Sequence, residues 1–218
     1  MDVSEIQSWD SGATNSGVAF NAPSNVTAGD DVVMSVFMVG GSNVTAVSGL
    51  GATWSKINGP IQYASGSYSL ETWIGNGATG GTKAITVTTN GGVQYYAMCY
   101  QARNGGTAIS GGTHQNGSGT TPTLTVTSIT KGSLVIVATR NQNTSSASPG
   151  SPWSTYIGTN NFWQANSFFQ TARQIAADNS DQTANWTQTS GNWATIGAIL
   201  QPVAAAAVGG FLPLLKGG

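Results

Sequence analysis

Charged side chains are scarce in this sequence of 218 residues, of which Asp, Glu, Lys and Arg make up 7%. Typical soluble domains hold about 25%. The formal net charge is −1, and the seven basic residues are scattered rather than gathered into a patch. Nucleic acid and anionic membranes bind through such a patch, so we expect neither as a partner. A weakly charged surface suits a subunit packed into an assembly.

Cysteine and histidine occur once each. A single cysteine excludes an intrachain disulfide, and the apolar run VQYYAMCY around Cys99 predicts a buried, inert thiol. His114 lies in a Gly-rich stretch. One histidine excludes a histidine-based zinc site, and a Ser-His-Asp triad would depend on this residue alone. No Gly-x-Ser-x-Gly motif is present to position a nucleophilic serine.

The few acidic residues do not form a pattern typical of catalysis. A glycosidase needs two carboxylates about 5 to 10 Å apart across a cleft. Glu71 lies on an expected strand without an acidic neighbour, and Asp30 and Asp31 precede a strand. Asp30 with Asp31, or Asp178 with Asp181, could hold calcium together with loop carbonyls, although neither pair has the spacing of a defined calcium loop. We therefore expect no catalytic residue, no cofactor and no metal.

The clearest organising feature is a repeat. Residues 29–57 and 131–157 both read as a Gly-polar start, an apolar run, a polar loop and a Trp-Ser pair, and residues 67–101 and 167–202 continue alike. A spacing of about a hundred residues is too long for a solenoid period and fits two halves of one domain. The repeat predicts an internal two-fold pseudo-duplication, with half-repeats at about 29–102 and 131–202, in one antiparallel β-sandwich domain spanning 1–203.

Apolar patterning supports an all-β fold. Residues 30–39 are apolar almost without interruption, which fits a strand covered on both faces or one whose outer face meets a partner. Residues 172–178 have helical propensity, but the repeat aligns them with the strand of Trp73, so we expect a strand. Residues 103–121 have the lowest hydrophobicity, and we expect a long surface loop that crosses between sheets.

Seven tryptophans are more than a chain of this size usually carries. Trp54 and Trp153 occupy equivalent positions in the repeat, which favours a place in the core. The segment Asn161-Phe162-Trp163-Gln164 lies between expected strands and is the best exposed candidate. Aromatic rings stack on sugar faces while amides bind hydroxyls. Trp163, with Asn161 and Gln164, is therefore a candidate glycan contact.

The two ends of the chain lie outside the repeat. The first twelve residues are polar and acidic and lack the apolar core of a secretory signal peptide, so we expect none. Residues 204–218 are expected to form an extended tail whose apolar part is too short to span a bilayer. We interpret this tail as an assembly anchor. Its candidate anchor residues are Phe211, Leu212, Leu214 and Leu215.

The order of these features, closed by Ile-Leu-Gln-Pro at 199–202, resembles the β-sandwich, jelly-roll-like domains common in minor structural proteins of tailed bacteriophages. The resemblance covers about residues 3–203. It implies a jelly-roll-like fold and a non-enzymatic virion protein, a capsid decoration or tail-surface subunit made in the host cytoplasm. Its partners would be other virion proteins and copies of itself, with no cofactor and no catalytic residue.

Two other functions remain open. The first is a carbohydrate- or receptor-binding β-sandwich module, of the fibre or adhesin kind, that uses Trp163 and the neighbouring amides. The second is a glycoside-cleaving enzyme, which would depend on Glu71.

Overall fold

The structure is a computed structural model that describes residues 1–109, 114–141, 149–157 and 168–204. Among these residues the fold is all-β, with antiparallel strand pairs and one short 3-10 turn, η1 (Asn90–Gly92). The expected antiparallel all-β class is therefore confirmed. The part of the chain that is described holds no helix long and apolar enough to cross a membrane. The strands are β1 (Ser4–Asp10), β2 (Ala19–Asn21), β3 (Asp31–Val39), β4 (Val44–Gly49), β5 (Thr53–Tyr63), β6 (Tyr68–Asn76), β7 (Ala84–Thr89), β8 (Tyr95–Arg103), β9 (Gly105–Ile109), β10 (Gln115–Gly119), β11 (Thr123–Val126), β12 (Leu134–Asn141), β13 (Ser154–Ile157), β14 (Phe168–Ile175), β15 (Gln182–Asn185) and β16 (Gly191–Pro202).

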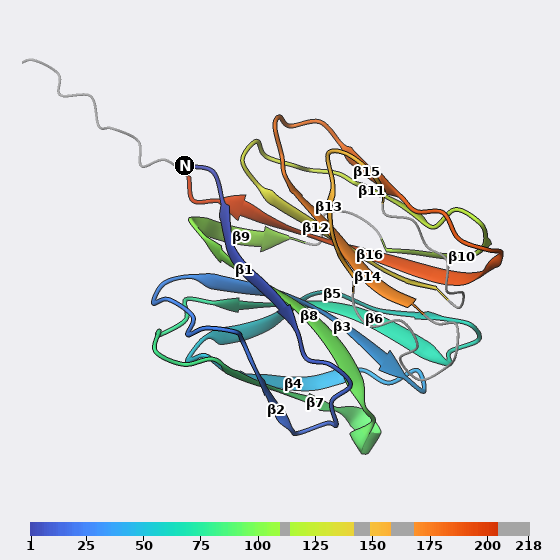
Figure 1. Ribbon diagram of the computed structural model, residues 1–218, viewed down its shortest axis with the longest axis horizontal. Coiled ribbons are helices and arrows are strands. Elements are labelled where there is room, and N and C mark those ends of the chain that lie inside the picture. Colours follow the sequence, from blue (N-terminus) through green and yellow to red (C-terminus); the bar gives the residue numbers. More distant parts are fainter. Residues whose placement is uncertain (110–113, 142–148, 158–167, 205–218) are drawn as a thin grey trace, which may run out of the picture.

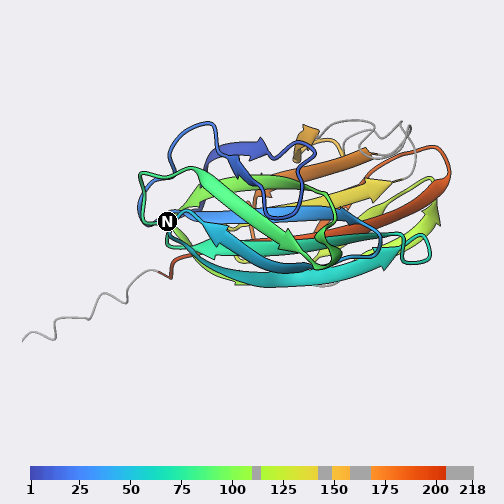
Figure 2. The same cartoon turned by 90° about the horizontal axis from the view of Figure 1, so that it is seen from below.

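The strands form two large and two small sheets. The first large sheet has the order β1-β8-β3-β6-β5, and the second has the order β10-β16-β12-β14-β13, with β9 also paired to β16. The first small sheet is β2-β7-β4 and the second is β11-β15. Figure 1 shows them stacked, with the two large sheets face to face in the middle and a small sheet on either outer side. Figure 2 shows many strands running along the long axis of the molecule.

This stacking explains the uninterrupted apolar run of β3. Alternate side chains of a strand point to opposite faces of its sheet. Met34 and Val36 pack in the core against the first small sheet, whereas Val33 and Phe37 pack toward the second large sheet. Both faces of β3 are therefore buried, as one of the two sequence interpretations predicted. The small-sheet strand β7 has its outer face open and alternates instead.

The central interface between the large sheets is rich in aromatic rings. The ring of Phe169 on β14 lies 5.9 Å from those of Phe37 on β3 and Tyr96 on β8. The buried Arg140 guanidinium lies 4.5 Å from the Phe37 ring centroid and donates a hydrogen bond to the Asn141 carbonyl. Burial lowers the pKa of Arg140 from its ordinary value. Aromatic and cation–π contacts of this kind join the two halves of the chain.

One expectation about local structure is wrong, and another is confirmed. Residues 103–121 do not form a single loop, because β9 and β10 both pair with β16. These strands have few apolar side chains, so their edge pairing, rather than their own burial, makes them strands. Residues 44–57 contain two strands in different sheets, β4 and the start of β5. Residues 172–175 are part of β14, as the repeat predicted.

Candidate functional site

The candidate site is a polar groove where an edge strand of each large sheet meets the other, β5 from the first and β10 from the second. It consists of two adjoining hollows of about 550 and 360 Å³ that share Gln62 and Asn116. The larger hollow is also lined by His114, Gln115 and Trp193. The smaller one extends along residues 63–66 and 117–118 to Asn192. Exposed amide side chains are the feature that the two hollows have in common.

The β5 wall of the groove is shaped by two irregularities in its pairing with β6, between Lys56 and Asn58 and between Asn58 and Ile61. Such bulges bend a strand and redirect its side chains. Asn58 Nδ2 donates to the carbonyl of Gly197 on β16 at 3.2 Å, and Asn58 Oδ1 accepts from the Gly59 amide at 2.8 Å. The bulged part of β5 is therefore anchored to the second large sheet.

The β10 wall contacts β5 directly. Asn116 Nδ2 donates to the Gln62 carbonyl at 2.8 Å, and His114 Nδ1 lies 3.4 Å from Asn58 Oδ1. A Cβ atom on Gly117 would lie 2.9 Å from Cζ2 of Trp193, so the indole lies across this glycine. Trp193 is buried, and its Nε1 has no hydrogen-bond partner among the described residues.

The lining of the groove limits its chemistry. Among the residues that the structure describes, no Asp, Glu, Lys or Arg lines either hollow. A pair of carboxylates for acid and base catalysis is therefore missing from this lining, as is a cation to hold a phosphate. The groove offers amide, imidazole and indole groups, which suit reversible binding of a neutral, polar ligand.

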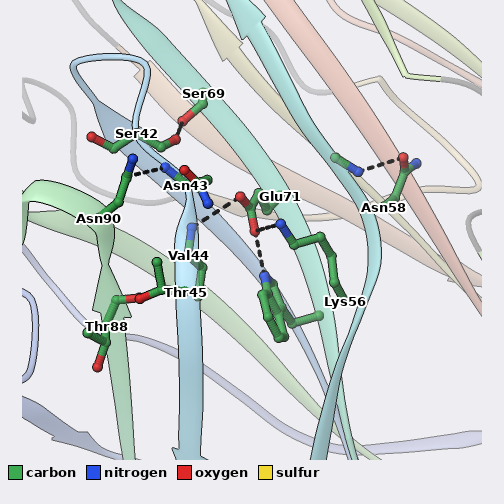
Figure 3. A network of polar contacts seen from close by, with 12 residues as sticks. Ser42, Asn43, Val44, Thr45, Lys56, Asn58, Ser69, Glu71, Thr88 and Asn90 are labelled. Atoms are coloured by element: carbon green, nitrogen blue, oxygen red, sulfur yellow. Dashed lines mark hydrogen bonds and ion pairs between the residues drawn. The ribbon is translucent and has the colours of Figure 1, made fainter.

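Glu71, the residue on which a glycosidase would depend, lies elsewhere, inside the first half (Figure 3). Its Oε1 accepts from the Val44 amide at 3.1 Å, and its Oε2 accepts from Trp73 Nε1 at 2.8 Å. Lys56 Nζ lies 3.0 Å from the same Oε2. The fully buried carboxylate is held by three donors and joins β4, β5 and β6, which is the arrangement of a structural group.

Asp30 and Asp31, one candidate calcium pair, are engaged by protein donors. Asp30 forms an ion pair with Arg103, with Nε at 2.9 Å from Oδ1. Asp31 Oδ1 accepts from the Gly77 amide at 3.0 Å and from Asn76 Nδ2 at 3.3 Å. Burial raises the pKa of the Asp31 carboxyl above its ordinary value, and these two hydrogen bonds partly oppose the change. The Asp31 side chain therefore holds the start of the turn between β6 and β7, and the Asp30 side chain binds the end of β8.

The second candidate calcium pair lies in the exposed turn between β14 and β15. Asp178 Oδ1 accepts from the Ser180 amide at 2.8 Å, and Asp181 is exposed. Within the described ranges, no group of three or more His, Cys, Asp or Glu side chains could hold a metal ion.

The sequence pointed to other residues than those of the groove. The proposed glycan contacts and tail anchors lie outside the described residues; they are Asn161, Trp163 and Gln164, and Phe211, Leu212, Leu214 and Leu215. Trp153 packs in the core of the second half, and Trp54 packs, partly buried, against that of the first. The amides at 115–116 are visible in the sequence, but their approach to β5 depends on long-range pairing.

Comparison with known proteins was made at the levels of family, sequence and structure. No protein-family model matches the chain, and no curated protein or solved structure matches it. Its function is therefore argued from its own residues and contacts.

Proposed function

We propose that this protein is a non-enzymatic structural subunit of a larger assembly, at the capsid or tail surface of a tailed phage, as the sequence resemblance implies. Its partners in this proposal are other virion proteins and copies of itself. The observation that carries the proposal is where the acidic side chains lie and what they bind. The buried carboxylates among the described residues are held by donors within the fold, and none lines the polar groove.

Glu5 illustrates this use of charge between the two halves. It forms an ion pair with Arg173, which joins β1 of the first large sheet to β14 of the second. The Arg173 guanidinium also lies 5.3 Å from the ring centroid of Tyr100 on β8. A rigid body held together by such contacts suits a load-bearing subunit better than an enzyme, which keeps titratable groups accessible in its cleft.

The layer order supports association through edges. The central strands of each large sheet are buried on both faces, so contacts with other subunits fall to the exposed outer strands, the outer faces of the small sheets and the ends of the molecule. Unpaired edge strands are natural sites for strand addition by another chain. On the edge strand β1, Ile6 is 45% exposed, which is unusual for a large apolar side chain in this fold.

An internal duplication and a jelly-roll-like topology are part of the proposal. The orders β8-β3-β6-β5 and β16-β12-β14-β13 correspond strand for strand, and β2 with β7 corresponds to β11 with β15. In the first half β8 lies between β1 and β3, and β7 lies between β2 and β4. Greek-key connections produce such interleaving in a jelly roll. The correspondence supports two related halves of about a hundred residues each.

Light scattering on the full chain and on a chain ending at Val203 tests the assembly role. We expect the full chain to form a defined oligomer and the shorter chain to stay folded by circular dichroism but become monomeric. An oligomer of unchanged size would contradict the tail as anchor. A monomer in both cases, with no binding to purified phage particles, would contradict the structural role altogether.

The alternative of a receptor-binding module that uses Trp163 stays a prediction, because that segment lies outside the described residues.

A further inference from the structure

We propose that the groove between β5 and β10 binds a neutral oligosaccharide. This inference goes beyond the assembly role and does not depend on it. It concerns residues other than the segment around Trp163. The groove-lining residues used in the argument are Gln62, His114, Gln115, Asn116, Asn192 and Trp193.

The size of the groove fits a small ligand. Ligand sites in proteins usually measure about 300 to 1,000 Å³. The larger hollow, of about 550 Å³, and the smaller, of about 360 Å³, are each in this range. They adjoin at Gln62 and Asn116, so one chain-like ligand of a few sugar units could occupy both.

The side chains of the groove match the chemistry of hydroxyl groups. A sugar hydroxyl both donates and accepts a hydrogen bond, and a carboxamide side chain offers two donors and an acceptor oxygen. Gln62, Gln115 and Asn116 are exposed at the groove and come from its two walls. Asn116 Nδ2 donates one hydrogen bond to the Gln62 main-chain carbonyl, and Gln62 Nε2 donates one to the Gly41 carbonyl, which leaves the acceptor oxygen and a second donor of each amide for a ligand. The lining can therefore bind several hydroxyls at once.

Neutral ligands are favoured over charged ones by the same lining. Neither hollow is lined by a charged side chain from the described residues, so phosphate and carboxylate groups would have no countercharge there. An extended peptide needs pockets for alternate side chains next to a free strand edge. Most of the exposed lining side chains here are polar instead, and three of them are amides. Trp193 lines the larger hollow as a buried side chain, and its indole N–H, also buried, has no partner in the described part of the chain.

The groove is built on strands rather than on long loops, which favours a fixed geometry. The contact of Asn116 to Gln62 joins the two walls directly, and that of Asn58 to Gly197 holds β5 to β16, the strand with which β10 pairs. A site whose walls are fixed before binding loses less conformational entropy when the ligand arrives. Neutral, strongly hydrated ligands such as sugars benefit most from this, because each hydrogen bond to them replaces one to water.

The test is titration of the full chain with four neutral tetrasaccharides, each built from one kind of sugar: α-glucose, β-glucose, N-acetylglucosamine or β-galactose. Binding is measured by calorimetry and by ¹⁵N NMR. We expect at least one to bind in the micromolar to millimolar range and to shift the backbone amide signals of residues 61–62 and 115–117. His114→Ala and Gln115→Ala remove exposed groove side chains, and together they should weaken binding about tenfold or more. Asn21→Ala, an exposed amide on the first small sheet, is the matched control and should change nothing.

Three results would overturn the proposal. The first is no binding of any of the four saccharides at 10 mM, and the second is binding that the paired groove variant leaves unchanged. The third is that the saccharide shifts amide signals only of residues outside 58–66 and 114–118. A mixture of unstructured octapeptides serves as a parallel probe, and binding of peptide alone would also refute a saccharide site. Light scattering on the same variants separates this result from the assembly role, which the groove variants should leave intact.

Discussion

Replacing Glu71 by Gln tests whether this carboxylate is structural. The change keeps the volume of the side chain but replaces one acceptor oxygen by an amide group that donates. Oε1 faces the Val44 amide, and Oε2 faces both Trp73 Nε1 and Lys56 Nζ, so either amide orientation brings donor against donor. The variant therefore loses at least one hydrogen bond and leaves a buried donor unsatisfied.

The expected cost follows from burial. Glu71 is fully buried, whereas the side chain of Lys56 is 30% exposed, so solvent screens part of their ion pair. An unsatisfied buried donor costs about 1 to 3 kcal/mol, and breaking a buried ion pair costs about 3 to 5 kcal/mol. Allowing for the exposed partner, we expect Glu71→Gln to lower the free energy of unfolding by about 3 kcal/mol.

Glu5→Gln is the matched control, because Glu5 also pairs with a basic residue but is partly exposed. Its loss should be about 1 kcal/mol or less. Equilibrium unfolding in urea, followed by tryptophan fluorescence, measures both variants against the parent protein. Equal losses at the two positions, or a loss below about 1 kcal/mol for Glu71→Gln, would refute the structural role of this carboxylate. Glycoside cleavage that disappears in Glu71→Gln without loss of stability would instead support the enzyme hypothesis.

Three further predictions concern titration, reactivity and packing. Because the pKa of Asp31 is raised in the folded protein, the protonated carboxyl stabilises the fold below its ordinary pKa, and this contribution is lost as pH rises through the raised value. The free energy of unfolding, measured between about pH 3 and pH 7, should show this loss in the parent protein but not in Asp31→Asn. Burial raises the pKa of the Cys99 thiol well above its ordinary value, so the native protein should not react with a disulfide reagent until urea unfolds it, and fast native reaction would refute this. A Cβ at Gly75 would lie 2.8 Å from Cε2 of Trp54, so Gly75→Ala should shift the indole, change its fluorescence and cost about 1 to 3 kcal/mol; an unchanged spectrum and stability would contradict that close contact.

The sequence predicted local structure best where burial produces a recognisable pattern of apolar residues. The apolar run at residues 30–39 indicated a strand covered on both faces or one whose outer face meets a partner, and the structure shows the first of these. Residues 172–175 of β14 have helical propensity, but alignment with the other half of the chain correctly predicted a strand there. The buried Cys99 could likewise be inferred from its apolar neighbours.

The groove could not be predicted, because none of its determining features is local. The sequence of β10, QNGSG, reads as a loop and becomes a strand only by pairing with β16. The bulges around Asn58 depend on the register of β5 against β6, which the hydrophobic pattern does not specify. A signal did exist in the amides at 115 and 116, but equally polar stretches elsewhere in this Asn- and Gln-rich chain form ordinary turns.

The position of the groove follows from the way the layers stack. The central strands of each large sheet pack against a small sheet on one face and against the other large sheet on the other, so they have no free face on which to hold a ligand. The strand edges are then the remaining places where the two halves present side chains jointly to solvent. At the β5 and β10 edge the pairing of β5 is irregular around Asn58, and the indole of Trp193 lies across Gly117. A ligand bound there would contact both halves of the chain, so its binding should raise the unfolding temperature of the whole molecule as one cooperative unit.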